Sequence, residues 1–453
     1  MDLVLLRKKH PRFIYESYSI KKEEKKLIIT FNFKLEPDIV FKPKLSIPIE
    51  STVEDKKIEN LVFHLGLIEL ISYWKATCSP EIIIKAANLS SSQLAWLRSL
   101  IIQGLGEFFY KNNIDFTSGE FFSITSDSDR LLNSYPSSQS TSGDLILVGE
   151  GKDSAVTLES LKDLKTKKMT LVLNPAKAAL KNIATAGYKN IITVQRTIDE
   201  KLLRLNNHGY LNGHTPFSAY LAFLGILIGT LYSYQNVIAS NEKSANEGNV
   251  KFHHLEVNHQ YSKSYPFEKL FRDYCFNNLT HEVNYFSFLR PLYNLQISKL
   301  FASYKQYHST FRSCNINRNQ DSWCGKCAKC VFTFLSLFPF LDYSKLIDIF
   351  GKDYFLETEM MQFFRGFVGL EKNKPFECVG TTEESILAVA LCLKKYKSEN
   401  KPIPSLLQSL EKDLNLNETF TKKLEQKIIK NWDGKHFLPE EYAELLKNLA
   451  QNL

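Results

Sequence analysis

The sequence of 453 residues lacks a secretion signal, an internal repeat and an evenly spaced set of cysteines. Its first ten residues, MDLVLLRKKH, hold too short an apolar run for a signal peptide, and no small-residue cleavage site follows them. Four of the eight cysteines lie in one short stretch, which fits a reducing compartment and a metal site better than a disulfide framework. We therefore expect a cytoplasmic protein.

Charged residues are absent from one long stretch, TPFSAYLAFLGILIGTLYSYQNVIASN at residues 215–241. A span of about 20 apolar residues can cross a membrane, but this one contains Ser, Thr, Gln, Asn and several Tyr. Thr215 and Pro216 are typical of a helix start, in which a capping hydroxyl precedes a proline at the first helical position. We predict a buried helix followed by a buried strand at NVIAS, and no association with a membrane.

The sequence also lacks a stretch that interleaves aromatic and basic residues, as single-stranded RNA sites do. The net charge of +8 suits any anion, and Lys and Arg are spread over the chain. We therefore expect a small-molecule substrate and no nucleic acid partner; no feature of the sequence specifies an oligomeric state. Apolar residues make up 44% of the chain, enough for the cores of two or three domains of roughly 150 residues each.

The order of the apolar patterns predicts an α/β fold. Residues 11–50 read as extended, residues 57–112 as helical and residues 133–143 as a polar boundary. Strands and helices then alternate, which predicts a doubly wound parallel sheet. Beyond about residue 350 the chain reads as helical, apart from a loop at NKPFECVGTTEES. The predicted domains are an N-terminal β-rich then helical domain (1–135), a core domain with the cysteine cluster (140–345) and a helical C-terminal region (346–453).

A glycine turn follows the first strand of the alternating region, in LILVGEGKDSAVTLESL. It does not match the Walker A loop, because Asp153 follows Gly151-Lys152 and Ile146 stands where the first glycine is needed. It does not match the dinucleotide fingerprint, because Ser154 stands where the third glycine is needed. Glycines next to a helix start suit a phosphate site; the alternative is an ordinary strand-to-helix turn.

The segment GEGKDS resembles the pyrophosphatase loop (PP-loop) of the ATP pyrophosphatase superfamily, whose usual form is SGGxDS after the first strand. The resemblance implies that residues 140–345 form a PP-loop core that cleaves ATP between the α- and β-phosphates, with Mg²⁺ held by Asp153. Glu150 departs from the usual glycine, so its carboxylate must point away from the phosphates or meet the metal. The implied ATP contacts are Gly149, Glu150, Gly151, Lys152, Asp153 and Ser154.

Four cysteines cluster in CNINRNQDSWCGKCAKC: Cys314, Cys324, Cys327 and Cys330. Two-residue gaps let neighbouring thiolates bind one ion, and nine residues suffice to bring the fourth back. Four thiolates predict a closed, structural Zn²⁺ site, with an iron–sulfur cluster or unligated thiols as alternatives. A similar cluster follows the core sheet in the 7-cyano-7-deazaguanine synthases of the same superfamily.

An ordered set of motifs between about residues 60 and 385 resembles the bacterial UDP-N-acetylmuramoyl-L-alanyl-L-glutamate epimerases. The motifs are GEGKDSAVTLE, LNNHGYLNGHTPFSA, SNEKSANEGNV, VNHQYSKSYPFEKLF, FSFLRPLYNLQISKLFA, WCGKCAKCVF and KPFECVGTTEE. The resemblance implies an isomerase of peptidoglycan synthesis that inverts a terminal L-Glu to D-Glu and converts ATP to AMP and diphosphate. Adenylation removes the charge of the carboxylate, so that a base can take the α-proton and return it on the opposite face.

Single residues are assigned from position and type. Asn174 and Arg196, at strand ends, are predicted to contact adenine or phosphate, and Lys263 to meet the diphosphate or a carboxylate of the substrate. The candidates for metal or substrate binding after NVIAS are Glu242, Lys243, Glu247 and Asn249. The candidate catalytic residues, besides Asp153, are Lys152, His214, His259 and Cys378.

Two other functions are open at this point. One is an enzyme of the same superfamily that forms a 7-deazaguanine base or modifies tRNA, which the metal cluster and the basic balance favour. The other is a non-catalytic nucleotide-binding protein, in which Glu150 has altered the loop.

Overall fold

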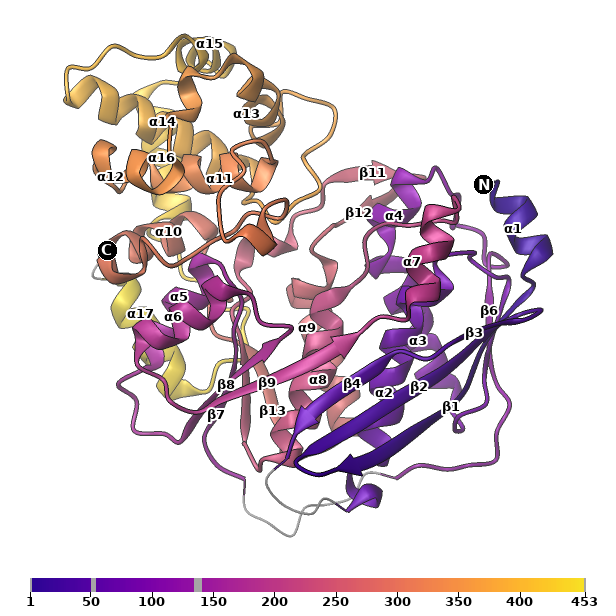
Figure 1. Cartoon of the computed structure of the whole chain (residues 1–453). Helices are drawn as coiled ribbons and strands as arrows, with labels where there is room; N and C mark the ends of the chain where they lie inside the picture. Colours follow the sequence, from indigo (N-terminus) through magenta and orange to yellow (C-terminus); the bar gives the residue numbers. More distant parts are fainter. Residues whose placement is uncertain (1, 50–53, 134–140, 452–453) are drawn as a thin grey trace.

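The structure, a computed structural model, describes residues 2–49, 54–133 and 141–451 (Figure 1). Five strands in the middle of the chain form a parallel sheet in the order β13-β10-β7-β8-β9. The order of the strands in the sheet reverses between β7 and β10, and ligands bind beyond the carboxyl ends of strands at such a switch point. The bounds are β7 (Asp144–Leu147), β8 (Lys168–Leu173), β9 (Ile191–Thr197), β10 (Asn236–Ala239) and β13 (Asn284–Ser287).

The N-terminal strands continue the same sheet. β4 (Lys44–Pro48) pairs antiparallel with β9, and β2 (Lys26–Leu35), β1 (Arg12–Glu23), β5 (Glu81–Ile84) and β6 (Ser123–Ser126) follow in that order. β3 (Ile39–Phe41) pairs with β2. Within the described residues the sheet therefore has 11 strands, and it extends across the boundary between the first two predicted domains. Most of the predicted boundary segment lies outside the described residues.

Helices cover both faces of the sheet, and successive residues of a strand point to opposite faces. Leu145 and Val237 belong to the core under the helices of one face, whereas their neighbours Ile146 and Ile238 belong to the core of the other. The first face carries α2 (Asp55–Trp74), α3 (Ser91–Gly104), α8 (Phe217–Leu231) and α9 (Tyr265–Asn278). The second carries α5 (Lys152–Leu161), α6 (Lys177–Ala186), α10 (Asn294–Ser303) and α17 (Glu440–Gln451).

The uncharged stretch forms the predicted buried helix and strand, α8 and β10. Its predicted cap was wrong: Pro216 itself is the N-cap residue, the helix begins at Phe217, and no side chain caps it. Gly225 lets α8 approach the sheet, since a Cβ there would lie 2.6 Å from Val237 Cγ1. Among the described helices, none has both the length and the apolar character that a membrane span needs.

The chain is helical beyond residue 350, as predicted, but the layer above α10 (Figure 1) begins earlier, at residue 328 inside the predicted core domain, and consists of six C-terminal helices. They are α11 (Ala328–Leu337), α12 (Tyr343–Phe350), α13 (Met361–Phe367), α14 (Thr382–Ser398), α15 (Ser405–Asp413) and α16 (Glu418–Ile428). The shorter elements elsewhere are α1 (Leu3–Lys9), α4 (Gly106–Lys111), α7 (Glu200–Asn207) and the hairpin β11 (Val250–Phe252) and β12 (Leu255–Val257). The predicted loop at NKPFECVGTTEES is confirmed as far as Thr381 and carries Cys378, but its last four residues form the start of α14.

Candidate active site

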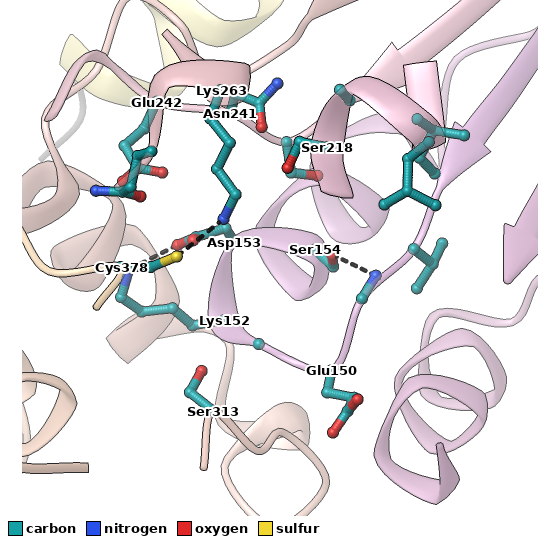
Figure 2. Close-up of a pocket in the computed structure, with 18 of the residues that line it drawn as sticks. Glu150, Lys152, Asp153, Ser154, Ser218, Asn241, Glu242, Lys263, Ser313 and Cys378 are labelled. Carbon is teal, nitrogen blue, oxygen red and sulfur yellow. Dashed lines mark hydrogen bonds and ion pairs between the residues drawn. The ribbon is translucent and has the colours of Figure 1, made fainter. Parts of the chain in front are cut away.

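A cavity of about 260 Å³ lies at the switch point, beyond the ends of β7 and β10 (Figure 2). Residues 149–154 line it from the turn after β7, and residues 240–242 line it from the loop after β10. Ser218 at the start of α8, Lys329 in α11 and Cys378 close its other sides. The structure thus brings the glycine turn, one end of the cysteine cluster and the C-terminal loop to a single place.

The glycine turn leaves the start of α5 open. Gly151 is the N-cap residue with φ −84°, and no side chain caps the helix, so its first amide groups have no partner within the helix. Gly149 N donates a hydrogen bond of 2.8 Å to Ser154 Oγ. A Cβ on Gly151 would lie 2.9 Å from Ser313 Oγ. The glycines therefore serve close approach of the chain, and the open amides can bind an anion.

Glu150 points away from the helix start, which is one of the two arrangements expected of it (Figure 2). Its carboxylate pairs with Arg318 from the cysteine-rich loop. Its carbonyl oxygen accepts hydrogen bonds from Arg312 N (2.9 Å) and Asn182 Nδ2 (3.1 Å). Glu150 stands where the usual loop has glycine, and its negative charge is therefore paired with a cation. These contacts also fix the glycine turn to the loop that carries Cys314.

Two carboxylates line the cavity beside the helix start. Asp153 Oδ1 pairs with Lys152 Nζ at 2.6 Å. Glu242 is buried, and burial together with the nearby charge of Asp153 raises its pKa to about 7. Asn294, also buried, has its Nδ2 3.5 Å from Glu242 Oε1, and its Oδ1 has no hydrogen-bond partner among the described residues. Such a set of oxygens suits a divalent cation.

A second cavity, of about 400 Å³, adjoins the first. His214 and His259 line it but not the first cavity. Asn315, which follows the first cysteine of the cluster, lines it as well. The residues common to both cavities are Phe217, Ser218, Gln260, Lys263, Lys329 and Cys378.

Cys378 lies at the junction with its sulfur 3.2 Å from Lys263 Nζ (Figure 2). Burial by itself would raise the pKa of this thiol, but the charges of Lys263, His259 and Lys329 hold the pKa well below its usual range. The ammonium of Lys263, which the sequence assigned to a substrate diphosphate, thus stands beside a thiolate. Low-pKa cysteines of this kind are nucleophiles or bases.

His259 connects Cys378 to a buried carboxylate that the sequence analysis did not single out. Its Nδ1 hydrogen-bonds Glu107 Oε2. Burial opposes a charge on His259, but the hydrogen bonds to Cys378 and Glu107 outweigh it and raise the pKa to about 9. His214 Nδ1 lies 3.5 Å from the same carboxylate oxygen; burial and the charge of His259 lower its pKa to about 3. At neutral pH one ring is therefore a cation and the other is neutral.

The cysteine cluster is assembled as predicted, with the four sulfur atoms all within 4.8 Å of one another. Backbone N–H groups point at the sulfurs: Asn317 N lies 3.2 Å from Cys314 Sγ, and Lys326 N lies 3.3 Å from Cys324 Sγ. Such bonds stabilise thiolates, and the four thiolates fit a tetrahedral metal ion. Lys329, between the last two cysteines, reaches both cavities.

Buried polar groups hold the loops that form the site. Arg290, 1% exposed, pairs with Glu268 and also donates to the carbonyl oxygens of Glu242 and Lys263. Asn249, predicted to bind metal or substrate, accepts from His259 N (2.8 Å) and donates to Pro375 O (2.7 Å). It therefore braces two segments of the site.

Four other predicted residues are engaged in contacts of their own. Asn174 Nδ2 donates to Arg196 O at 2.9 Å, and the Arg196 guanidinium pairs with Glu69. Lys243 pairs with Asp433 at 3.2 Å, and Glu247 accepts from Lys374 and Thr382. The described residues that line the two cavities do not include these four.

Sequence reasoning missed four residues of the site: Glu107, Gln260, Asn294 and Lys329. Glu107 lies on α4, far from the motifs in sequence, and no local pattern distinguishes it from a surface glutamate. Lys329 stood inside the cysteine motif, where only the metal ligands were considered. Gln260 follows His259 directly in HQYSKS, so the signal was present, but only the basic side chains were weighed.

Comparison with known proteins gives consistent matches over most of the chain. The family profile for the MurL N-terminal domain matches residues 5–288, and that for the MurL C-terminal domain matches residues 307–421. A protein of Salinispora tropica is 30% identical over 428 residues, 91% of this chain and 90% of its own length. A protein of Xanthomonas oryzae pv. oryzae is 29% identical over 382 residues, 83% of either chain. Both are named UDP-N-acetyl-alpha-D-muramoyl-L-alanyl-L-glutamate epimerase. No solved structure shows a significant match.

Proposed function

The chain belongs to the MurL epimerase family, and on that premise we propose that it inverts the terminal L-Glu of UDP-N-acetylmuramoyl-L-alanyl-L-glutamate to D-Glu for peptidoglycan synthesis. The observation that carries the proposal is the pair of adjoining cavities. One lies over an open helix start, and the other contains a thiol and two histidines. We propose a cytoplasmic reaction, where ATP and nucleotide-linked precursors are found.

We propose that the first cavity binds ATP with its phosphates at the start of α5. The open amide groups of residues 152–154, the helix dipole and the ammonium of Lys152 favour an anion there. Asp153 and Glu242, with the oxygen of Asn294, would hold Mg²⁺, which would neutralise phosphate charge and orient the chain of phosphates. The substrate carboxylate attacks the α-phosphate, so that the products are diphosphate and an acyl adenylate.

Adenylation makes the inversion chemically possible. A proton next to a carboxylate is very weakly acidic, because its loss would place a negative charge beside an existing one. Converting the carboxylate to a mixed anhydride with AMP removes the first charge. The histidines of the second cavity, His259 and His214, would then face the α-carbon and carry the proton, with Cys378 at the junction beside the carboxyl group. Hydrolysis of the activated acid makes each turnover irreversible and gives the inversion a direction.

We also propose that the four cysteines hold a structural Zn²⁺. The ion would supply no chemistry of its own, because four protein ligands close its coordination sphere. Its role would be to fix the loop that brings Arg318 to Glu150, and Asn315 and Lys329 to the cavities.

The proposal is tested by following ATP labelled at the α-phosphate in the presence and absence of the dipeptide substrate. We expect substrate-dependent AMP and diphosphate, with no ADP. Lys152→Met should slow AMP formation by about 100-fold, the effect typical of losing one stabilising charge in an active site. Lys162→Met, an exposed lysine just after the same helix, should be unaffected. Formation of ADP, or AMP formation that ignores the substrate, would contradict the proposal.

A further inference from the structure

The two cavities place the polar groups of the site in a definite order. Lys152 and Asp153 line only the first cavity, His214 and His259 line only the second, and Cys378 lines both. An acyl group activated on a nucleotide in the first cavity would therefore have its carbonyl carbon next to Cys378. Its α-carbon, one bond farther from the phosphate, lies towards the histidines.

The junction of the two cavities also contains a buried polar side chain, Gln260. Gln260 lines both cavities and is 4% exposed. Its Nε2 donates to Val379 O at 3.3 Å, but its Oε1 has no hydrogen-bond partner among the described residues. A buried amide oxygen without a partner is costly, so a donor group of a bound molecule is expected there, beside Cys378.

From this order we propose that Cys378 is a nucleophile, which takes the acyl group from AMP as a thioester on which the α-proton is then exchanged. The inference rests on the proposed function, because it needs the acyl adenylate. It assigns Cys378 to covalent catalysis, and it assigns Glu107 to positioning and charging His259.

The steps balance without a further reactant. The sulfur of the thiolate bonds to the carbonyl carbon, the bond from that carbon to the phosphate-linked oxygen breaks, and the electron pair leaves with AMP. A base takes the α-proton, and the enolate oxygen lies among the ammonium groups of Lys263 and Lys329. A proton that comes from solvent is then added to the opposite face of the α-carbon. Water then gives its hydroxyl to the acyl carbon and its proton to the sulfur.

The contacts of Cys378 fit a nucleophile. Lys263 Nζ at 3.2 Å and the His259 cation keep the sulfur ionised before the attack. Acylation removes the negative charge of the sulfur, so the pKa of His259, raised to about 9 in part by that thiolate, falls. A neutral imidazole next to the α-carbon then becomes available as the base. Glu107 holds the ring in place through both states.

The test is a single turnover of the full-length protein with Mg-ATP and UDP-N-acetylmuramoyl-L-alanyl-L-glutamate, quenched in acid at millisecond intervals. Intact mass spectrometry of the denatured protein should show a transient adduct with the mass of the substrate less one water. Hydroxylamine should remove the adduct, and digestion should locate it on the peptide that contains Cys378. The adduct should rise as AMP is released and decay as free D-Glu product appears.

Two variants and one control keep the outcomes separate. Cys378→Ala should retain substrate-dependent exchange of labelled diphosphate into ATP but lose the adduct and at least 100-fold of α-proton exchange. Cys378→Ser should either form a longer-lived ester adduct or lose both the adduct and α-proton exchange, as Cys378→Ala does. Cys392→Ser, which changes a buried thiol outside both cavities, should behave as wild type. Release of AMP and formation of D-Glu by the wild type without any adduct would overturn the thioester and leave the proposed function standing. So would rapid α-proton exchange in Cys378→Ala. Absence of substrate-dependent AMP would overturn both.

Discussion

Replacing Glu107 by Gln should uncouple the charge of His259 from Cys378. The buried carboxylate is the hydrogen-bond partner of His259 Nδ1, and the pKa of His259 is raised from 6.5 to about 9 against the effect of burial. A difference of that size corresponds to ~3 kcal/mol. If Glu107 and Cys378 share it evenly, Glu107→Gln removes ~1.5 kcal/mol, or about a tenfold change in the protonation equilibrium.

The consequence for His259 has a defined sign. In the variant the imidazolium loses a neighbouring negative charge, so the pKa of His259 falls and the Cys378 thiolate loses its neighbouring cation at a lower pH than in the wild type. The midpoint for loss of the His259 proton, followed by NMR of the imidazole ring against pH, should therefore lie about one pH unit lower than in the wild type, and kcat should fall at the pH values where the wild-type ring is still a cation and the variant ring is not. The other titratable groups around the pair are retained: Lys75, Lys111, His214, Lys263, Lys329 and Glu377.

Asp115→Asn is the matched control, because Asp115 lies just beyond the same helix and its side-chain bonds are to Thr117. It should leave both the midpoint and kcat unchanged. A midpoint for His259 in Glu107→Gln identical to that of the wild type, with folded protein and unchanged kcat, would refute the coupling.

Three further variants test the framework. Arg290→Met should lower the free energy of unfolding by about 3–5 kcal/mol, because it leaves the buried charge of Glu268 without its cation. Arg365→Met, in a partly exposed pair, should cost less than ~1 kcal/mol in the same denaturant titration. Gly66→Ala should lower the free energy of unfolding by about 1–3 kcal/mol, because the new Cβ would overlap the Tyr15 hydroxyl, even though alanine favours helices. Gly119→Ala is the control, because a Cβ there would lie in open space, and it should change the melting temperature little. Cys314→Ser should abolish bound zinc measured by mass spectrometry of metals, and Cys392→Ser should keep it; equal zinc in both would exclude the cysteine site.

Four of the five strands of the parallel core, β7 to β10, were predictable together with α5, α6 and α8, because their apolar runs are short, regular and separated by turn residues. The edge strand β13 was not predicted. β5 was not, since EIII between two helices is too short a run for its period to be read. The pairing of β4 with β9, which joins the N-terminal strands to the core sheet, could not be predicted from the sequence either. It depends on pairing between residues 44–46 and 195–197, which no local pattern specifies.

In the candidate site too, the local motifs were predictable from the sequence and the contacts between distant segments were not. The glycine turn and the cysteine cluster are local motifs, and the structure assembles both as expected. The contact between Cys378 and Lys263, and the bond from His259 to Glu107, join segments more than 100 residues apart. Arg196 was chosen for its place at a strand end, but the buried carboxylate of Glu69, on a neighbouring helix, competes for its charge.

The central claim, ATP-driven inversion through an activated carboxyl group, is tested most directly by one incubation in D₂O. Purified protein, Mg-ATP and UDP-N-acetylmuramoyl-L-alanyl-L-glutamate are combined, and AMP, diphosphate, the chirality of the glutamate and deuterium at its α-carbon are followed together. The account predicts D-Glu that carries one deuterium, formed only with ATP and accompanied by AMP and diphosphate. Inversion without ATP, or D-Glu that retains the original hydrogen, would contradict it.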